Sequence, residues 1–232
     1  MSLTLPVPAE YRHRATLMYV APFLVFVTLM AVERSIALPA GVFYPIRLGA
    51  VLLTLGLVSW PAISLRASAP WSSIGVGIAV FLVWIGPDVL FGPGYHHFWL
   101  FSNPVTGSPV SSLRPALRQQ WGFLAIRTIS CTLMVPVLEE LFWRGWLMRW
   151  LINREFLKVP LGAYAPSAFW AVALLFASEH GSFWDVGLAA GIIYNWWCLR
   201  TKNLADCILA HAVTNGILSA YVLYGGQWQY WL

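Results

Sequence analysis

The sequence is poor in charged residues. Only 10% of its 232 residues are Asp, Glu, Lys or Arg, whereas a soluble domain carries about 25%. Hydrophobic residues make up 59% of the chain, and the mean hydropathy is +0.68. So little charge excludes an ordinary water-soluble fold. The composition predicts an all-α, polytopic membrane protein, because helices satisfy their own backbone hydrogen bonds in lipid.

Cysteine is scarce, and several catalytic motifs are absent. The three cysteines, Cys131, Cys198 and Cys207, have no CxxC spacing and lie in or beside apolar runs. We therefore interpret them as small buried side chains rather than a disulfide or metal set. The chain has no HExxH zinc helix, no GxSxG nucleophile elbow and no GxGD aspartate motif. The net charge of +5 comes from single bases between apolar runs, so we expect no nucleic-acid partner.

Long apolar runs recur along the chain. They predict a bundle of seven to eight helices, seven of them spanning the membrane, in a single integral membrane domain over residues 1–232. The first run is interpreted as a retained helix rather than a signal peptide, because no small-x-small cleavage site follows it. The long loop at 92–120 is expected to lie on the membrane surface, with a short helix at 113–120. The expected spans are 15–32, 48–65, 74–91, a long segment from 121, 161–178, 186–199 and 204–224.

Basic residues predict the orientation of the bundle. With the N-terminus inside, eight bases fall in inner loops and four in outer loops, as the positive-inside rule favours. The fourteen tryptophans suit the two membrane interfaces. A GxxxG pattern at 187–191 predicts close helix packing. The inner bases are Arg12, Arg14, Arg66, Arg149, Arg154, Lys158, Arg200 and Lys202, and the outer ones are Arg34, Arg47, Arg114 and Arg118.

Two acids and a base, Glu139, Glu140 and Arg144, interrupt the apolar run that begins at residue 121. Ionisable groups at membrane depth cost about 2.5–3.5 kcal/mol each on insertion scales, which indicates a function or a shared polar network. Residues four apart share a helix face, so Glu140 and Arg144 are expected to form an ion pair. Glu139 is turned about 100° from Glu140. We expect it to face a cavity as a general base, with a purely structural network as the alternative.

Two later apolar runs each carry a histidine. Phe176 and His180 lie four apart on one face, with Glu179 as no more than a rim carboxylate; His211 and Asn215 form a second such pair. Each pair alone is equally consistent with interfacial hydrogen bonding or helix–helix contact. Together with Glu139 they supply a base, a polarising group and hydrogen-bond donors for an oxyanion. These are the groups needed to activate water and cleave an amide.

In this order on successive apolar helices, the three motifs resemble those of the CPBP family. That family groups type II CAAX prenyl endopeptidases with bacteriocin-processing and immunity (Abi) proteins. The resemblance covers residues 121–224 and implies an intramembrane endopeptidase. It assigns water activation to Glu139 and His180, and oxyanion stabilisation to His211 and Asn215. The short, Trp-rich chain most resembles the bacterial CAAX-protease-related branch, so we expect a multi-pass protein of the bacterial inner (cell) membrane.

The resemblance leaves the cofactor open. Family members are often described as metalloproteases, and Glu139, His180 and His211 would be the ligands if zinc is bound. Arg144 would compete with a metal for one carboxylate, so we prefer a metal-free mechanism. The expected partners are a membrane-associated protein or peptide substrate and the lipid bilayer.

Two alternatives to a protease follow from the same residues. A non-enzymatic Abi-type scaffold or immunity protein would use the polar cavity for binding alone. A proton-relay transporter is disfavoured, because the chain shows no inverted repeat.

The protease hypothesis also requires a particular arrangement of two helices. Glu139 lies about 20 Å along its helix from the inner end and His211 only about 10 Å, so one of the two helices must be tilted or raised.

Overall fold

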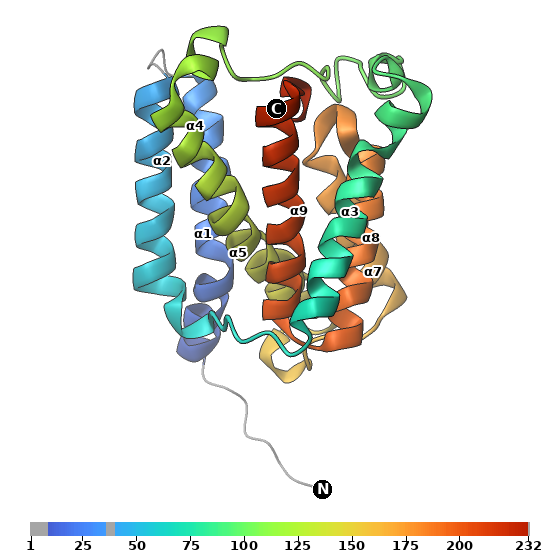
Figure 1. Ribbon diagram of the computed structural model, residues 1–232. Helices are drawn as coiled ribbons and strands as arrows, with labels where there is room; N and C mark the ends of the chain where they lie inside the picture. The colour runs from blue at the N-terminus through green and yellow to red at the C-terminus, as the bar shows by residue number, and fades with distance from the viewer. Residues whose placement is uncertain (1–8, 36–39, 232) are drawn as a thin grey trace, which may run out of the picture.

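The molecule is an all-α helical bundle, as expected from its composition (Figure 1). The computed structural model describes residues 9–35 and 40–231, and in these no strand occurs. The helices are α1 (Ala9–Ser35), α2 (Ala40–Thr54), α3 (Pro70–Phe91), α4 (Trp121–Ile129), α5 (Val135–Glu140), α6 (Met148–Ile152), α7 (Pro166–Ser178), α8 (Trp184–Thr201) and α9 (Leu204–Gly225). Helices α1 and α2 form one side of the bundle, α3, α7 and α8 form the other, and α9 lies between them.

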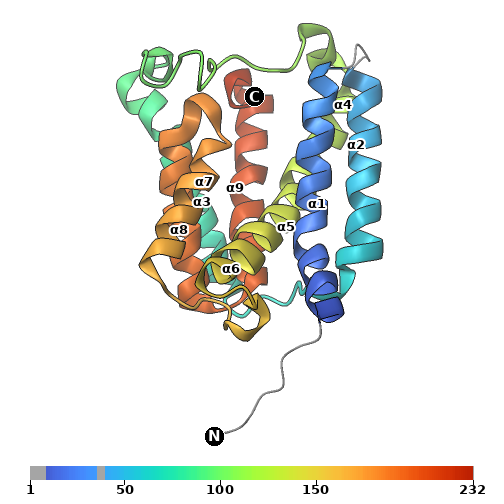
Figure 2. The same ribbon diagram turned by 180° about the vertical axis from the view of Figure 1, so that it is seen from behind.

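Helices α4, α5 and α6 are parts of one long helix, Trp121–Ile152. Two π-helical segments, Ser130–Met134 and Leu141–Leu147, interrupt it on either side of α5. A helix of this length measures about 48 Å and is longer than the ~30 Å hydrocarbon core of a bilayer, so it must tilt. Figures 1 and 2 show it crossing the bundle diagonally. This tilt brings α5 to the lower half of α9. It is the tilt that the protease hypothesis requires if Glu139 and His211 are to line one site.

Within residues 9–35 and 40–231, five helical segments are long and apolar enough to cross a membrane. They are residues 13–33, 41–62, 70–91, 121–152 and 204–225. The other two predicted spans are helices but differ from the expectation. Helix α7 starts at Pro166 rather than 161 and has 13 residues, or about 20 Å. Helix α8 has 18 residues and contains Asp185, Asn195 and Arg200, so its composition is more polar than that of a typical span.

Helices α7 and α8 pack closely on each other and depend on glycine to do so. A Cβ atom on Gly191 would lie 3.2 Å from the Ala173 carbonyl oxygen. The prediction of close packing from the GxxxG pattern is therefore confirmed. The same small-residue rule applies to α3 and α9, because a Cβ atom on Gly77 would lie 2.4 Å from the Ala210 carbonyl oxygen.

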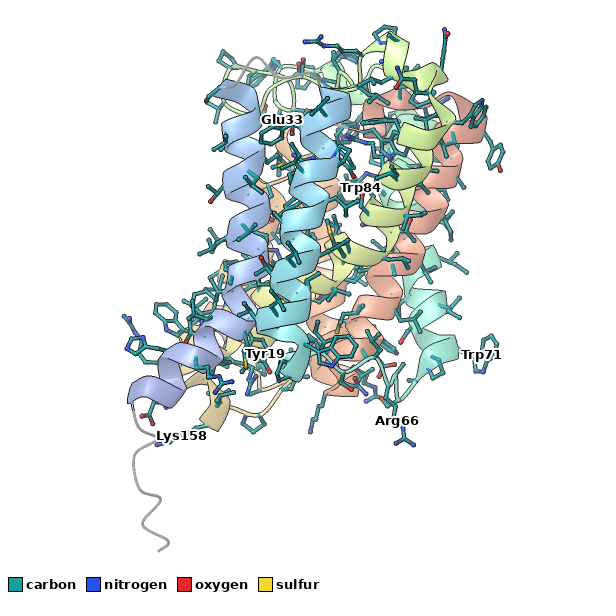
Figure 3. The ribbon with its side chains drawn as sticks, turned by 90° about the vertical axis from the view of Figure 1, so that its left-hand side faces the viewer. Tyr19, Glu33, Arg66, Trp71, Trp84 and Lys158 are labelled. Carbon is teal, nitrogen blue, oxygen red and sulfur yellow. The ribbon has the colours of Figure 1, made fainter. Side chains whose placement is uncertain are left out.

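The two ends of the bundle differ in charge. Figure 3 shows Arg66 and Lys158 at the lower end of the molecule, and Glu33 near the upper end.

The expected interfacial tryptophans Trp71 and Trp121 are highly exposed at 83% and 79%, as an interfacial belt requires. The predicted surface helix at 113–120 is a 3₁₀ helix over Pro115–Gln119.

The N-terminus of α3 is capped by a carboxylate from another helix. Asp206, on α9, accepts hydrogen bonds from the backbone N–H groups of Ser68 at 3.0 Å and Ala69 at 2.9 Å. It also accepts from the hydroxyls of Ser68 and Ser73. These donors have no partner within α3 itself, so a carboxylate here satisfies them and interacts favourably with the helix dipole.

Replacing Asp206 by Leu should destabilise the protein by about 2–4 kcal/mol, because the four donors, among them buried Ser73, lose a charged acceptor. Asp206→Asn should be milder, since the amide keeps one oxygen acceptor. The measurement is the thermal unfolding temperature in detergent. An Asp206→Leu variant as stable as the wild-type protein would contradict this role.

A second polar group joins the upper end of α3 to α8. Both ring nitrogens of buried His96 face carboxylates: Nδ1 lies 2.9 Å from Asp88 Oδ2 and Nε2 lies 3.1 Å from Asp185 Oδ1. The Tyr230 hydroxyl donates to the same Asp88 oxygen at 2.8 Å. Asp88 and Asp185 belong to none of the three sequence motifs. Their partner is this histidine, which lies in the long surface loop.

The His96 cluster makes stability depend on pH. Burial favours the neutral ring, but the hydrogen bonds that the ring donates to Asp185 and Asp88 outweigh burial and raise the pKa of His96 from 6.5 to about 9. Because the folded-state pKa is raised, this stabilisation is complete below about pH 6.5 and is lost as the pH rises through 9. The unfolding temperature should therefore fall between pH 8 and 10 by a step that His96→Gln lacks, whereas a variant of the exposed neighbour, His97→Gln, should retain it.

Candidate functional site

A cavity of about 470 Å³ lies inside the bundle and is lined by residues from every major helix. The predicted site residues Glu139, His180, His211 and Asn215 all line it. They come from α5, from the end of α7 and from α9, segments that are far apart in the sequence. Glu140 and Arg144 lie behind the cavity wall and are fully buried, with 0% exposure. The structure thus brings the three sequence motifs to one place.

Glu140 and Arg144 form the ion pair that their spacing predicts. Arg144 Nη1 donates to Glu140 Oε1 at 2.9 Å. The guanidinium uses its other sides as well: Nε donates to Asn195 Oδ1 at 2.9 Å, and Nη2 donates to the Gly191 carbonyl at 3.3 Å. It also stacks over the Phe176 ring at 4.7 Å. A buried pair held by this many partners fixes α5 against α7 and α8.

Asn195 is part of this network and was missed by the sequence analysis. It lies on α8, and its amide nitrogen donates to the Phe169 carbonyl on α7 at 2.9 Å. The signal in the sequence was a single amide inside the apolar run at 186–199. An amide in such a run has many possible partners, so its spacing from Arg144 could not be read from the chain.

His211 is oriented by Glu140. Its Nδ1 lies 3.0 Å from Glu140 Oε1, and its ring stacks on Tyr194 with a centroid distance of 5.0 Å. The Tyr194 hydroxyl donates to Thr214, which donates to the Gly77 carbonyl. An ionised carboxylate can only accept, so Nδ1 carries the proton and Nε2 is the nitrogen left for the cavity.

His180 is oriented by its own helix. Its Nδ1 lies 2.8 Å from the Phe176 carbonyl oxygen. Because a carbonyl only accepts, Nδ1 carries the proton and Nε2 of the neutral ring is a free acceptor. The ring also contacts Trp84, with centroids 5.0 Å apart in a T-shaped pair. Trp84 belongs to α3 and lies in the interior of the bundle (Figure 3), so a helix that looked generic in the sequence contributes to the site.

The ring of His180 packs directly on Gly187. A Cβ atom at this glycine would lie 3.0 Å from His180 Nδ1 and 3.1 Å from its Cβ and Cγ. Gly187→Ala should therefore displace the imidazole and lower kcat for peptide cleavage by about tenfold or more, since small misplacements of a reacting group are costly. The matched control is Gly86→Ala, where a Cβ atom would meet nothing within 4 Å. Equal activity in the two variants would contradict a role for the His180 position.

Glu139 stands apart from the ion pair, as its place on the helix predicts. It lines the cavity, and its Oε2 atom is buried with no hydrogen-bond partner among the residues that the structure describes. Asn215 Nδ2 donates to the Cys131 carbonyl at 3.0 Å, which leaves the second amide proton for the cavity. Glu179, expected only at the rim, also lines this cavity. A buried carboxylate oxygen without a protein partner is suited to bind a water molecule.

Several side chains that line the cavity are of types that can bind a metal ion. Among the residues that the structure describes, no group of three or more His, Cys, Asp or Glu side chains is arranged to hold one. Glu140, the carboxylate nearest to His211, is already shared by Arg144 and His211. A zinc site requires three or four ligands at close to 2 Å, and Glu139, His180 and His211 are not grouped in that way among the described residues.

Comparison with known proteins gives one match. The model of the family described as type II CAAX prenyl endopeptidase Rce1-like matches residues 121–217. The matched segment begins at the start of α4, ends within α9 and includes all six predicted site residues. Neither the search of curated proteins nor the search of solved structures gives a match. Over these helices, which carry the buried ion pair and all four cavity-lining site residues, the chain is similar to the Rce1-like family of type II CAAX prenyl endopeptidases.

Proposed function

We propose that the protein is an intramembrane endopeptidase that hydrolyses a peptide bond in a membrane-associated substrate, with Glu139 as the general base. One observation carries the proposal: a single cavity is lined by a carboxylate with a free buried oxygen, two oriented histidines and an amide. The match of residues 121–217 to the model of an endopeptidase family supports it. The proposed location is the bacterial cell membrane.

Glu139 and His180 are the two groups suited to activate water. The Glu139 carboxylate can accept a proton from a water molecule as that water attacks the substrate carbonyl. His180 Nε2, an acceptor in the neutral ring, can orient the same water. The proton held by Glu139 then passes to the leaving amine nitrogen when the carbon–nitrogen bond breaks. Glu139 returns to its starting state, and the products are a carboxylic acid and an amine, which become a carboxylate and an ammonium group when the acid proton passes to the amine.

His211 and Asn215 are suited to stabilise the oxyanion of the tetrahedral intermediate. Asn215 has one amide proton not used by Cys131. His211 donates from Nε2 only when the ring is an imidazolium, because Nδ1 already carries the proton that faces Glu140. The positive charge then lies between the Glu140 carboxylate and the developing oxyanion. The ion pair with Arg144 keeps Glu140 in place for this role.

The proposed mechanism uses no metal, because Glu139 and His180 can activate the water themselves. Zinc analysis of the purified protein, together with activity measured after chelation, tests this choice. Activity that disappears with a chelator and returns with zinc would overturn it.

The proposal is tested by comparing the termini of membrane proteins in cells that carry the wild-type protein, Glu139→Ala or His180→Ala. We expect new termini in the wild-type sample that are missing from both variants. Identical termini in all three samples would overturn the proposal and favour a non-enzymatic scaffold. The phenotype of a scaffold should survive Glu139→Gln and fail on bulky substitutions in the cavity.

A further inference from the structure

On α3, the His96 cluster and the candidate site are one helical turn apart. Asp88, which lies 2.9 Å from His96 Nδ1, follows Trp84 by four residues, so the two side chains share a face of the helix. Trp84 lines the cavity, and its ring contacts the ring of His180 with centroids 5.0 Å apart. The turn of α3 that His96 holds is therefore the turn that packs on His180.

On α8, the cluster and the site are closer still. Asp185, which lies 3.1 Å from His96 Nε2, is two residues before Gly187, and both belong to the first turn of the helix. The ring of His180 occupies the space beside Gly187, where a Cβ atom would lie 3.0 Å from His180 Nδ1. His96 therefore binds the same helical turn on which His180 packs.

A third contact connects His96 with the short turn that follows His180. The rings of His96 and Phe183 pack on each other with centroids 4.3 Å apart. The backbone N–H of Phe183 donates to the His180 carbonyl oxygen at 2.9 Å, and the Phe183 side chain lines the cavity. His96 itself is only 1% exposed, so its ring fills a fixed position between α3, α8 and this turn.

Only a protonated ring can hold both carboxylates of the cluster. A neutral imidazole has one N–H donor and one acceptor, whereas an imidazolium donates from both nitrogens. The other titratable groups at the ring are Tyr230, which donates to Asp88, and Tyr95, whose ring lies edge-on to His96. The pKa of His96, which the hydrogen bonds to Asp185 and Asp88 raise to about 9 against the effect of burial, keeps the ring charged at neutral pH.

We propose that His96 is a positioning residue for the reaction: its imidazolium ring ties α3 to α8 and so holds His180 where it can orient the attacking water. The inference rests on the proposed peptidase function and adds a dependence on pH to that same site. When the ring loses its proton, one carboxylate faces a nitrogen lone pair, and α3 and α8 are no longer fixed relative to each other. Activity is therefore lost as the pH rises through about 9.

The test compares four forms of the purified protein in detergent, well below their unfolding temperatures. His96→Gln cannot hold both carboxylates, because an amide donates from only one of its two polar atoms. Asp185→Asn is the compensating variant, since its amide can accept from a charged ring or donate to a neutral one. His97→Gln, at the exposed neighbour, is the matched control for the wild-type protein. The measurements are kcat and KM for peptide cleavage from about pH 7 to about pH 10.

We expect His96→Gln to lower kcat about tenfold at pH 7 and to leave KM nearly unchanged, because a reacting group is misplaced while the rest of the cavity is kept. The kcat of the wild-type protein and of His97→Gln should fall between about pH 8 and 10. Asp185→Asn should retain a larger fraction of its pH 8 activity at pH 10. A His96→Gln variant that unfolds at a lower temperature but keeps the kcat and pH profile of the wild-type protein would overturn the inference.

A second measurement does not depend on cleavage. The chain has five histidines, so the ring nitrogens of His180 can be followed by NMR of protein that contains ¹⁵N-labelled histidine, with the signal assigned by its loss in His180→Gln. This signal should shift in His96→Gln and should stay in place in His97→Gln. A His180 signal that is the same in all of these forms would overturn the inference while leaving the peptidase function standing. A shift in His96→Gln without cleavage of any peptide by the wild-type protein would support the coupling and count against the proposed function.

Discussion

Glu139→Gln should lower peptide-bond hydrolysis by about 10²–10⁴-fold, the usual contribution of a positioned general base. Glutamine has the size of glutamate and can still hydrogen-bond a water molecule, but it cannot accept the proton of that water. The substitution should leave the fold intact, because Glu139 is not part of the Glu140–Arg144 pair that holds α5 in place. The measurement is the rate of cleavage by purified protein, with the unfolding temperature recorded for both forms.

The matched control for this variant is Glu155→Gln. Glu155 lies in the lower loop between α6 and α7 and pairs with Lys158, outside the cavity. Cleavage by Glu155→Gln should equal that of the wild-type protein. Full activity in Glu139→Gln would remove this residue from the chemistry and leave His180 as the remaining candidate base.

Arg144→Met should destabilise the protein by about 3–5 kcal/mol, because it leaves the Glu140 carboxylate buried without its cation. The variant also removes the donors to Asn195 and to the Gly191 carbonyl, which join α5 to α8. We expect a large fall in the unfolding temperature and a parallel loss of activity, since Glu140 orients His211. Thermal unfolding in detergent is the direct measurement.

Two comparisons separate charge from packing in this network. Glu140→Gln combined with Arg144→Met removes the unpaired charge and should recover part of the stability lost in Arg144→Met alone. Arg66→Met, which removes an exposed arginine at the lower end, should change stability little. A double variant no more stable than Arg144→Met would show that the hydrogen bonds to α8, rather than the charge on Glu140, hold this part of the bundle.

The local chemistry of the central helix could be predicted because it depends on spacing within one element. The pairing of Glu140 with Arg144 follows from the α-helical period, and so does the separate direction of Glu139. The depth of the site could not be predicted in this way. It depends on the tilt of the helix over residues 121–152 and on its π-helical segments, which are set by packing against α1 and α9.

Most of the residues whose contacts could not be predicted from the sequence come from the first half of the chain. The helices and loops of this half have sequences that are generic for a membrane protein. They contain Trp84, Gly77, Arg47 and the central histidine of the His96 cluster. Arg47, which the sequence assigned to an outer loop, lies inside α2. Apolar helices in lipid can pack in many ways, because the surrounding lipid tails are as apolar as the side chains. Which residues of α2 and α3 meet the site was therefore decided by contacts between helices rather than by any pattern along them.

The sequence by itself determined the all-α membrane class, the composition of the three motifs and the internal division of Glu139, Glu140 and Arg144. These features rest on local periodicity and on the cost of charge in lipid, both of which act residue by residue. Only the tertiary structure decided that His211 is held by Glu140, that Trp84 and Gly187 position His180, and that His96 joins the two helices that carry Trp84 and Gly187. Those relations join helices that are distant in the chain, and shape complementarity between helices sets them.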